Sequence, residues 1–149
     1  MKARDLMTPN PEVITPDEPT YRAAELMRDL DVGFIPVVDD PTSRRLVGVI
    51  TDRDIAVRCV AGGCDLNAPV AHHMTSEDID RVSPETDSDE VMRLMQRDQV
   101  RRIPVVEEDG RLLGVISQAD LVLRAGPQEP EKVEKTIERI SEPTHRAGR

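Results

Sequence analysis

The chain has 149 residues, with 20 basic and 29 acidic side chains and a formal net charge of −9. This acidic balance repels phosphate backbones, and one Tyr and one Phe cannot form a base-stacking platform, so we expect no nucleic-acid binding. No stretch approaches the roughly 18 consecutive apolar residues of a membrane span. The first residues also lack the apolar run of a signal peptide, so we expect a cytoplasmic protein that does not contact a membrane.

An internal repeat becomes visible when the sequence is aligned with itself. The repeat predicts two tandem copies, residues 1–66 and 67–130, followed by a C-terminal segment, residues 131–149. Either copy alone would leave the apolar face of its sheet exposed to water, so we expect the two copies to share one core with pseudo-twofold symmetry. The matching segments are "DLMT" at 5–8 with "HHMT" at 72–75, "VGFIPVVDD" at 32–40 with "VRRIPVVEE" at 100–108, and "RLVGVITDRDI" at 45–55 with "RLLGVISQADL" at 111–121.

Each copy reads as a short strand, a helix, two strands and a second helix. The first helix of each copy begins at a hydroxyl residue that can act as an N-cap, Thr20 in the first copy and Ser88 in the second. Apolar residues then recur at helical spacing, which predicts a core-facing stripe. These residues are Ala23, Leu26, Met27 and Leu30 in the first copy, and Val91, Leu94 and Met95 in the second.

Two short β-branched runs follow in each copy and predict a pair of strands. Pro36 and Pro104 lie inside the first run of each pair, so these strands need an edge or starting position where a missing N–H does no harm. Asp109-Gly110 is typical of a hairpin turn in the second copy. The overall pattern predicts a mixed fold of the α/β (α+β) class.

The second helix of each copy begins directly after the strand pair. Its apolar stripe ends at Gly62-Gly63 in the first copy and at Gly126-Pro127 in the second. Within residues 131–149, "EKVEKTIERI" predicts a short amphipathic helix that docks on the domain or on a partner subunit, and we assign no function to the tail "EPTHRAGR". The stripes comprise Ile55, Ala56, Cys59 and Val60, then Leu121, Val122 and Ala125, and finally Val133, Ile137 and Ile140.

Both second helices open with a hydroxyl residue followed by Asp at the fourth position, Thr51 with Asp54 and Ser117 with Asp120. One interpretation is a capping box that satisfies the free N–H groups of the helix. The other is a ligand site, because a capping box prefers the longer Glu or Gln, and because α/β proteins collect anionic and sugar-bearing ligands where a strand leads into a helix. The sequence leaves both interpretations open.

Taken together in this order, these motifs resemble a CBS-domain pair, or Bateman module, over about residues 3 to 126. The chain is most similar to the stand-alone bacterial type that includes the hypoxic response proteins, with "TDRDI" followed by "AGGCDLN" as the most similar passage. The resemblance implies two β-α-β-β-α repeats packed through their sheets, with two clefts between them. It also implies a regulatory role and a ligand such as AMP, ADP, ATP or S-adenosylmethionine.

The resemblance further implies which residues hold such a ligand. Asp54 and Asp120 would bind ribose hydroxyls with the support of Thr51 and Ser117. The adenine would lie against Ile35-Pro36 and Ile103-Pro104, and phosphate would meet Arg101 and Arg102.

The two copies differ at the positions that would meet phosphate. The first has Gly33 and Phe34 where the second has Arg101 and Arg102, while Arg53 has no basic counterpart. Three arginines could converge on one phosphate if they face a common cleft, and they could equally be exposed surface residues. We expect the two clefts to differ.

Cys59 and Cys64 are the only cysteines. We interpret them as small, partly buried residues beside a helix end, because disulfides are rare in a reducing cytoplasm. A metal site with His72 and His73 is the alternative, but adjacent histidines point in different directions on most backbones and no motif spacing supports it. We therefore expect no metal and no required cofactor.

Three functions compete at this stage. The first is a regulatory module, expected to be a homodimer, that senses an adenosine-containing ligand for a separate partner protein; the resemblance implies a role in a stress response. The second is a structural or interaction dimer with vestigial clefts and no nucleotide binding. The third, an enzyme, is disfavoured, because the sequence has no Ser/His/Asp arrangement, no Walker-type glycine loop and no acid–base partner for His72, His73 or His145.

Overall fold

The computed structural model describes residues 1–143 and divides them into two compact units. One unit contains Glu12–Ile79. The other joins Met1–Pro11 to residues 80–143. The first eleven residues thus pack with the second half of the chain. The boundaries of the compact units therefore differ from those of the predicted repeats, residues 1–66 and 67–130. The repeat boundaries stay a prediction.

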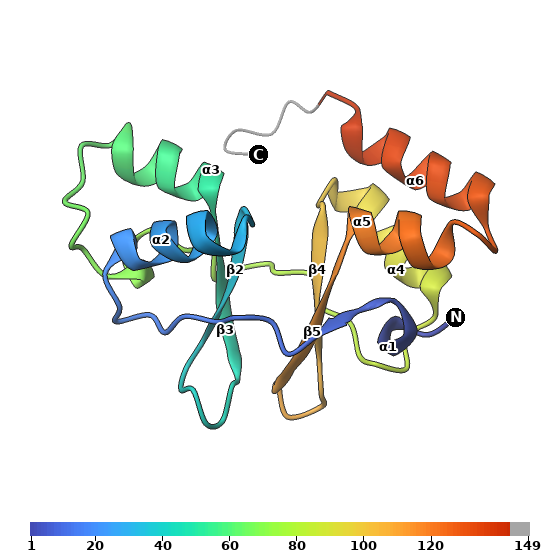
Figure 1. Cartoon of the computed structure of the whole chain (residues 1–149), viewed down its shortest axis with the longest axis horizontal. Helices are drawn as coiled ribbons and strands as arrows, with labels where there is room; N and C mark the ends of the chain where they lie inside the picture. Colours follow the sequence, from blue (N-terminus) through green and yellow to red (C-terminus); the bar gives the residue numbers. More distant parts are fainter. Residues whose placement is uncertain (144–149) are drawn as a thin grey trace. The chain divides into compact units, whose positions relative to one another are not determined.

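The unit of residues 12–79 is a β-hairpin with two helices on one side of it (Figure 1). Its buried apolar cluster joins the hairpin residues Ile35, Val37 and Ile50 to Ala23 and Met27 of the first helix. The elements are α2 (Thr20–Leu30), β2 (Phe34–Val38), β3 (Leu46–Thr51), α3 (Asp52–Asp54), the π-helical segment η1 (Ile55–Val60) and the 3₁₀ turn η2 (Val70–His72).

The other unit contains a three-stranded sheet in the order β1-β5-β4 and a core built in the same way. Ile103 and Val105 from β4 pack with Val91 and Met95 from α4. The elements are α1 (Ala3–Leu6), β1 (Thr8–Pro9), α4 (Ser88–Asp98), β4 (Arg102–Val106), β5 (Leu112–Ser117), α5 (Gln118–Asp120), the π-helical segment η3 (Leu121–Ala125) and α6 (Pro130–Ser141).

The two hairpins have the same register, which confirms the repeat at the level of single residues. Phe34 lies opposite Thr51 in one hairpin, and Arg102 lies opposite Ser117 in the other. Each hairpin also has an irregularity at the same place, between Val37 and Val38 and between Val105 and Val106. The turn before β5 contains Gly110 at φ 90°, as the Asp-Gly signal predicted.

Pro36 occupies a position of β2 where its missing N–H removes no bond to β3. Its partner across the hairpin is Val49. Val49 already uses its N–H and C=O with Thr75, at 2.9 and 2.8 Å. In an antiparallel ladder such a pair is a non-hydrogen-bonded one, so proline is tolerated there.

Each Met-Thr segment pairs with the second hairpin strand of the other sequence copy. The segment at Met7-Thr8 pairs with β5, and the segment at Met74-Thr75 pairs with β3. Thr8 pairs with Val115, and Thr75 forms a bridge with Val49. The glycines of the two strands make room for these segments. A Cβ at Gly114 would lie 2.7 Å from the Thr8 carbonyl oxygen, and one at Gly48 would lie 2.9 Å from that of Thr75. This exchange explains why the Met-Thr pair and the strand glycine both recur in the sequence.

The N-caps of α2 and α4 lie one residue earlier than the sequence predicted. Pro19 is the N-cap of α2, and the Thr20 hydroxyl instead donates to the carbonyl of Ala68 at 2.8 Å. Asp87 is the N-cap of α4 and accepts a hydrogen bond from the N–H of Asp89 at 3.1 Å. Ser88 is therefore not the cap, because the carboxylate before it takes that role.

The predicted apolar stripes are only partly buried. Leu30, Val60 and Val122 are 42%, 64% and 51% exposed, whereas Cys59 and Leu121 are fully buried. The second helices open with one α-helical turn and continue as π-helix, which shifts the side chains away from 3.6-residue spacing. The N–H of Ala61 accordingly bonds to the carbonyl of Ala56, five residues back, at 2.9 Å.

Helix α6 packs on its own unit. Val133 and Ile140 belong to the same buried cluster as the α4 residues, and Ile137 packs against that cluster. Gln96 of α4 donates to the Thr136 hydroxyl at 2.8 Å. The predicted amphipathic helix is confirmed, and it docks on the domain. The tail "EPTHRAGR" lies largely outside the described residues, as does His145.

Candidate functional site

The first candidate site lies where β3 leads into α3. The N–H of Thr51 donates to Oδ2 of Asp54 at 2.9 Å, and the N–H of Asp54 donates to the Thr51 hydroxyl at 3.0 Å. These two bonds form a complete capping box, and Asp54 is 8% exposed. The capping interpretation of this motif is therefore confirmed as geometry, and the short Asp side chain reaches the N-cap.

The second candidate site repeats this arrangement where β5 leads into α5. The N–H of Ser117 donates to Oδ2 of Asp120 at 2.9 Å, and the N–H of Asp120 donates to the Ser117 hydroxyl at 3.2 Å. The Ser117 hydroxyl in turn donates to Oδ2 of Asp120 at 3.1 Å. Asp120 is also 8% exposed. Both carboxylates are thus held in fixed orientation at a strand end.

The outer carboxylate oxygens distinguish the two sites. Oδ1 of Asp120 accepts a hydrogen bond from the Thr8 hydroxyl at 3.1 Å. Oδ1 of Asp54 lies 3.7 Å from Nε of Arg58, an ion pair in which Arg58 is largely exposed. One outer oxygen therefore has a neutral donor beside it, and the other has a cation beside it whose guanidinium also donates to the Met74 carbonyl at 3.1 Å.

The predicted site residues are divided between the two units. Residues 12–79 include Ile35, Pro36, Thr51, Arg53 and Asp54. The remaining predicted residues belong to the unit of residues 1–11 and 80–143, and they are Arg101, Arg102, Ile103, Pro104, Ser117 and Asp120. In each unit the first strand of the hairpin, β2 or β4, begins opposite the hydroxyl residue of the site. Phe34 lies opposite Thr51, and Arg102 lies opposite Ser117.

Backbone pairing shows how close these residues are. The N–H of Gln118 donates to the Arg101 carbonyl at 3.0 Å, and Arg102 lies opposite Ser117. Arg101 and Arg102 are therefore neighbours of the second site. Arg53, an exposed residue of α3, lies in the first site's own turn. Convergence of the three arginines on one phosphate stays a prediction.

The isoleucines predicted to meet the adenine are part of the cores. Ile35 is 1% exposed and Ile103 is fully buried, each within the apolar cluster of its unit. Their side chains pack against other core residues, so a base at this place would meet strand backbone. The adenine position implied by the resemblance stays a prediction.

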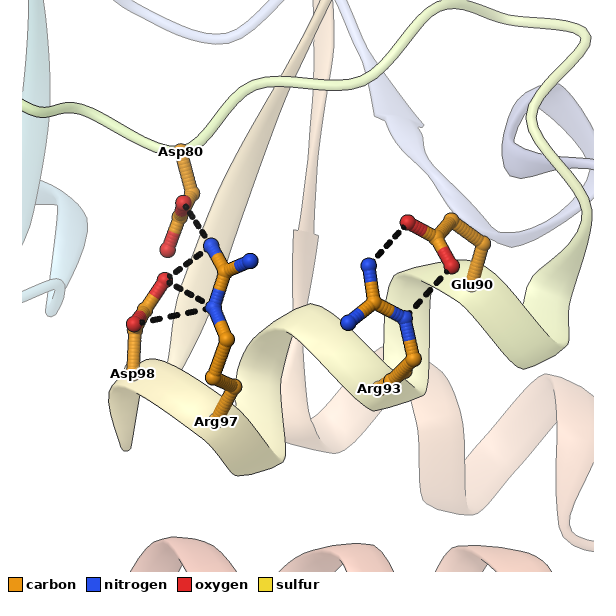
Figure 2. Close-up of polar contacts among 5 residues, drawn as sticks. All are labelled: Asp80, Glu90, Arg93, Arg97 and Asp98. Carbon is orange, nitrogen blue, oxygen red and sulfur yellow. Dashed lines mark hydrogen bonds and ion pairs between the residues drawn. The ribbon is translucent and has the colours of Figure 1, made fainter.

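The groups whose pKa departs clearly from its ordinary value lie elsewhere, on the surface of α4 among other places. The hydrogen bond from Arg93 lowers the pKa of the Glu90 carboxyl (Figure 2). The hydrogen bond to Asp98 raises the pKa of Arg97, which also contacts Asp80 (Figure 2). The arginine of each pair is more than half exposed, so these ion pairs lie at the surface. They give no indication of acid–base chemistry.

Two features of the sites were missed in the sequence. The first is Thr8, whose hydroxyl reaches Asp120 although the two residues are 112 positions apart. The recurrence of the Met-Thr pair was visible, but nothing local assigns it to the other copy's strand. The second is a cluster formed by Cys59, Cys64 and His73, whose ligand-capable atoms lie within 4.8 Å of one another. The sequence offers a metal site of the cysteines with His72 and His73 only as the alternative interpretation, because adjacent histidines diverge and no motif spacing supports it.

The cysteines differ from their predicted state. Cys59 and Cys64 are joined by a disulfide, with Cα atoms 4.8 Å apart. The expectation of two unlinked small residues is wrong for this structure, because the chain turns back at the end of η1 and brings the sulfurs together. The N–H of Cys64 bonds to the Cys59 carbonyl at 2.9 Å in this turn.

Comparison with known proteins shows the family to which the chain belongs. The CBS domain family model matches residues 3–60 and 70–125, and the chain belongs to this family. The predicted CBS-domain pair and the fold of tandem β-α-β-β-α repeats are thus confirmed. Among the helices of residues 1–143, none is long and apolar enough to cross a membrane.

Several individual proteins are similar to this chain over most of their length. The chain is 35% identical over 119 residues to Hypoxic response protein 1 of Mycobacterium tuberculosis, covering 80% of this chain and 81% of that protein. It is similar to the crystal structure of Hypoxic Response Protein I with two coordinated zinc ions, with a TM-score of 0.74, 33% identity, and coverage of 83% and 98%. It is also similar to the crystal structure of CBSX2 in complex with AMP, with a TM-score of 0.73, 29% identity, and coverage of 87% and 98%.

Proposed function

We propose that this protein is a regulatory module that binds an adenosine-containing ligand at its strand-end carboxylates and signals to a separate partner protein. In this proposal it acts in the cytoplasm as a homodimer, is not an enzyme, and needs no other cofactor. The ligand is AMP, ADP, ATP or S-adenosylmethionine, and AMP is the first to test because CBSX2 has been crystallised with it.

The observation that carries the proposal is the fixed orientation of Asp54 and Asp120. In each carboxylate one oxygen is held by the N–H at the end of the strand, at 2.9 Å, which orients the other oxygen. A carboxylate accepts hydrogen bonds from the hydroxyls of a vicinal diol such as that of ribose. Because the carboxylate is already ordered, little conformational entropy is lost when the diol binds.

The second site has the more complete set of groups for a nucleotide. Arg102, the first residue of β4, lies opposite Ser117, and the Arg101 carbonyl accepts a hydrogen bond from the N–H of Gln118. Thr8 adds a hydroxyl beside Asp120. Guanidinium groups bind phosphate through paired, charge-assisted hydrogen bonds. We therefore propose that the Asp120 site binds the ribose phosphate portion of the ligand and that the Asp54 site binds more weakly.

A thermal-shift series on the intact chain tests this function. A ligand that binds only the folded state stabilises it by about 2.7 kcal/mol at 100 times its dissociation constant. We expect AMP to raise the melting temperature, adenosine to do so less, and GMP to have little effect. Asp120→Asn should reduce the AMP shift, because the amide can still cap the helix but has lost the charge and one acceptor oxygen.

The control variant is Asp52→Asn, on the same turn as Asp54 but exposed. It should leave the AMP shift unchanged. The absence of a shift with all four adenosine ligands, or an equal loss of shift in Asp52→Asn and Asp120→Asn, would contradict nucleotide sensing.

Specific observations favour a second candidate, a structural or interaction dimer with vestigial clefts. The capping boxes alone account for both aspartates. Each second helix exposes a pair of apolar residues, Val57 and Val60 in one and Val122 and Leu123 in the other, at 45%, 64%, 51% and 74%, and clustered exposed apolar residues are typical of interaction sites. A dimer that dissociates on dilution, together with melting temperatures that no ligand changes, would favour this candidate over the sensor.

A further inference from the structure

Three residues of the unit of residues 12–79 form a cluster that the proposed nucleotide function does not use. Cys59 lies in the π-helical segment η1, Cys64 lies in the turn after it, and His73 directly follows η2. One atom of each, the two sulfurs and a ring nitrogen, lies within 4.8 Å of the others. Tertiary folding thus collects two soft ligand atoms and an imidazole from separate segments.

His73 is buried, and one of its ring nitrogens lacks a hydrogen-bond partner among the described residues. The residue is 7% exposed, and its Nε2 is buried without a hydrogen-bond partner among the described residues. Leaving a buried polar atom unpaired costs free energy, so native proteins nearly always give such an atom a partner. Its neighbour His72 is exposed, although the two side chains are chemically identical.

We propose that Cys59, Cys64 and His73, with the thiols reduced, bind one zinc ion or a borderline-soft divalent ion like it. Thiolate and imidazole are the preferred ligands of zinc, whereas calcium and magnesium require oxygen ligands that this cluster lacks. Three protein ligands leave a fourth position of a tetrahedral ion open to water or an external ligand.

The disulfide seen in the structure and the metal-bound state exclude each other. Reduction adds two electrons and two protons to the Cys59–Cys64 disulfide and yields two thiols. A phosphine reductant supplies the electrons and is itself converted to the phosphine oxide with oxygen from water. Binding of the ion then releases the thiol protons, because the thiolate is the ligand. The oxidised chain has no thiolate to offer.

Cobalt(II) provides the test, because thiolate ligation of this zinc substitute gives a charge-transfer band and tetrahedral ligation gives intense visible bands. The full chain is reduced with a phosphine, freed of metal and titrated with cobalt, and zinc is then added. We expect both sets of bands to saturate at one ion per chain and to disappear as zinc displaces cobalt. The unreduced, disulfide-bonded chain should show neither.

Matched variants identify the ligands. Replacing a residue that only supports a metal ligand costs about 10–100-fold in metal affinity. Loss of a direct ligand should cost more, so we expect His73→Ala to weaken cobalt binding by at least about 100-fold. His72→Ala, one residue away and exposed, should leave it unchanged. Cys64→Ser, at a half-buried position, should abolish the charge-transfer contribution of that sulfur without depending on how well the His73 variant folds.

The proposal is wrong if the reduced chain gives no thiolate band, if the bands survive in both His73→Ala and Cys64→Ser, or if His72→Ala weakens binding as much as His73→Ala. Far-UV circular dichroism of each metal-free variant confirms that it is folded, and His73→Gln replaces His73→Ala if the latter is not. The titration contains no nucleotide, so its outcome is independent of the proposed sensing function.

Discussion

The unequal surroundings of the two capping aspartates predict unequal losses of stability when each is replaced by alanine. Asp120→Ala removes the partner of three donors, namely the Ser117 N–H, the Ser117 hydroxyl and the Thr8 hydroxyl, at 2.9, 3.1 and 3.1 Å. Asp54→Ala removes the partner of the Thr51 N–H, at 2.9 Å, and a long ion pair with the exposed Arg58 at 3.7 Å.

The difference can be estimated from these contacts. The N-cap residues Thr51 and Ser117 stay in place, so each replacement removes the reciprocal bond of the capping box, and every hydrogen bond lost costs about 1 kcal/mol net. We therefore expect Asp54→Ala to destabilise by about 1 kcal/mol and Asp120→Ala by about 2–3 kcal/mol. The ion pair adds little, because pairs with an exposed partner are screened by solvent.

Urea unfolding followed by far-UV circular dichroism measures both variants, and a double-mutant cycle with Thr8→Val isolates the third bond. We expect a coupling of about 1 kcal/mol between Thr8 and Asp120. Equal destabilisation by Asp54→Ala and Asp120→Ala, or a coupling indistinguishable from zero, would refute the reasoning.

Two further predictions follow from packing and surface charge. Gly114→Ala should destabilise by about 1–3 kcal/mol in urea unfolding, because its Cβ would meet a backbone carbonyl. Gly33→Ala should cost less, since it meets only a carboxylate side chain that can rotate; equal costs would contradict the packing argument. Arg93→Ala should raise the pKa of Glu90 towards its ordinary value in an NMR titration, and an unchanged pKa would rule out Arg93 as the cause. Because folding with Arg93 present lowers this pKa, the stability that the pair contributes is present above the ordinary pKa of Glu90 and is lost as pH falls through the lowered value.

The repeat and its local elements could be predicted because they depend on neighbouring residues. The strand pairs, the Asp-Gly turn before β5 and the capping motifs at Thr51 and Ser117 all have short-range signals. The conversion of the second helices to π-helix has no such signal, and it is the reason that Val60 and Val122 are exposed where 3.6-residue spacing predicted burial.

The missed features depend on contacts between distant segments. Periodicity identifies the Met-Thr segment as repeated but cannot tell which strand it joins, so the bond from Thr8 to Asp120 could not be predicted. Cys59, Cys64 and His73 are also brought together from separate segments. The sequence offers a metal site with His72 and His73 only as the alternative, because no motif spacing supports it and which histidine reaches the cysteines depends on the fold.

Calorimetric titration of the intact chain with AMP tests the central proposal most directly. We predict saturable binding that Asp120→Asn weakens by at least about tenfold, since the loss of one charge-assisted hydrogen bond costs roughly 1.5–3 kcal/mol. Asp54→Asn should have a smaller effect, and Asp52→Asn should have none. Heats that do not saturate, or the same affinity in the parent chain and in Asp120→Asn, would contradict the account.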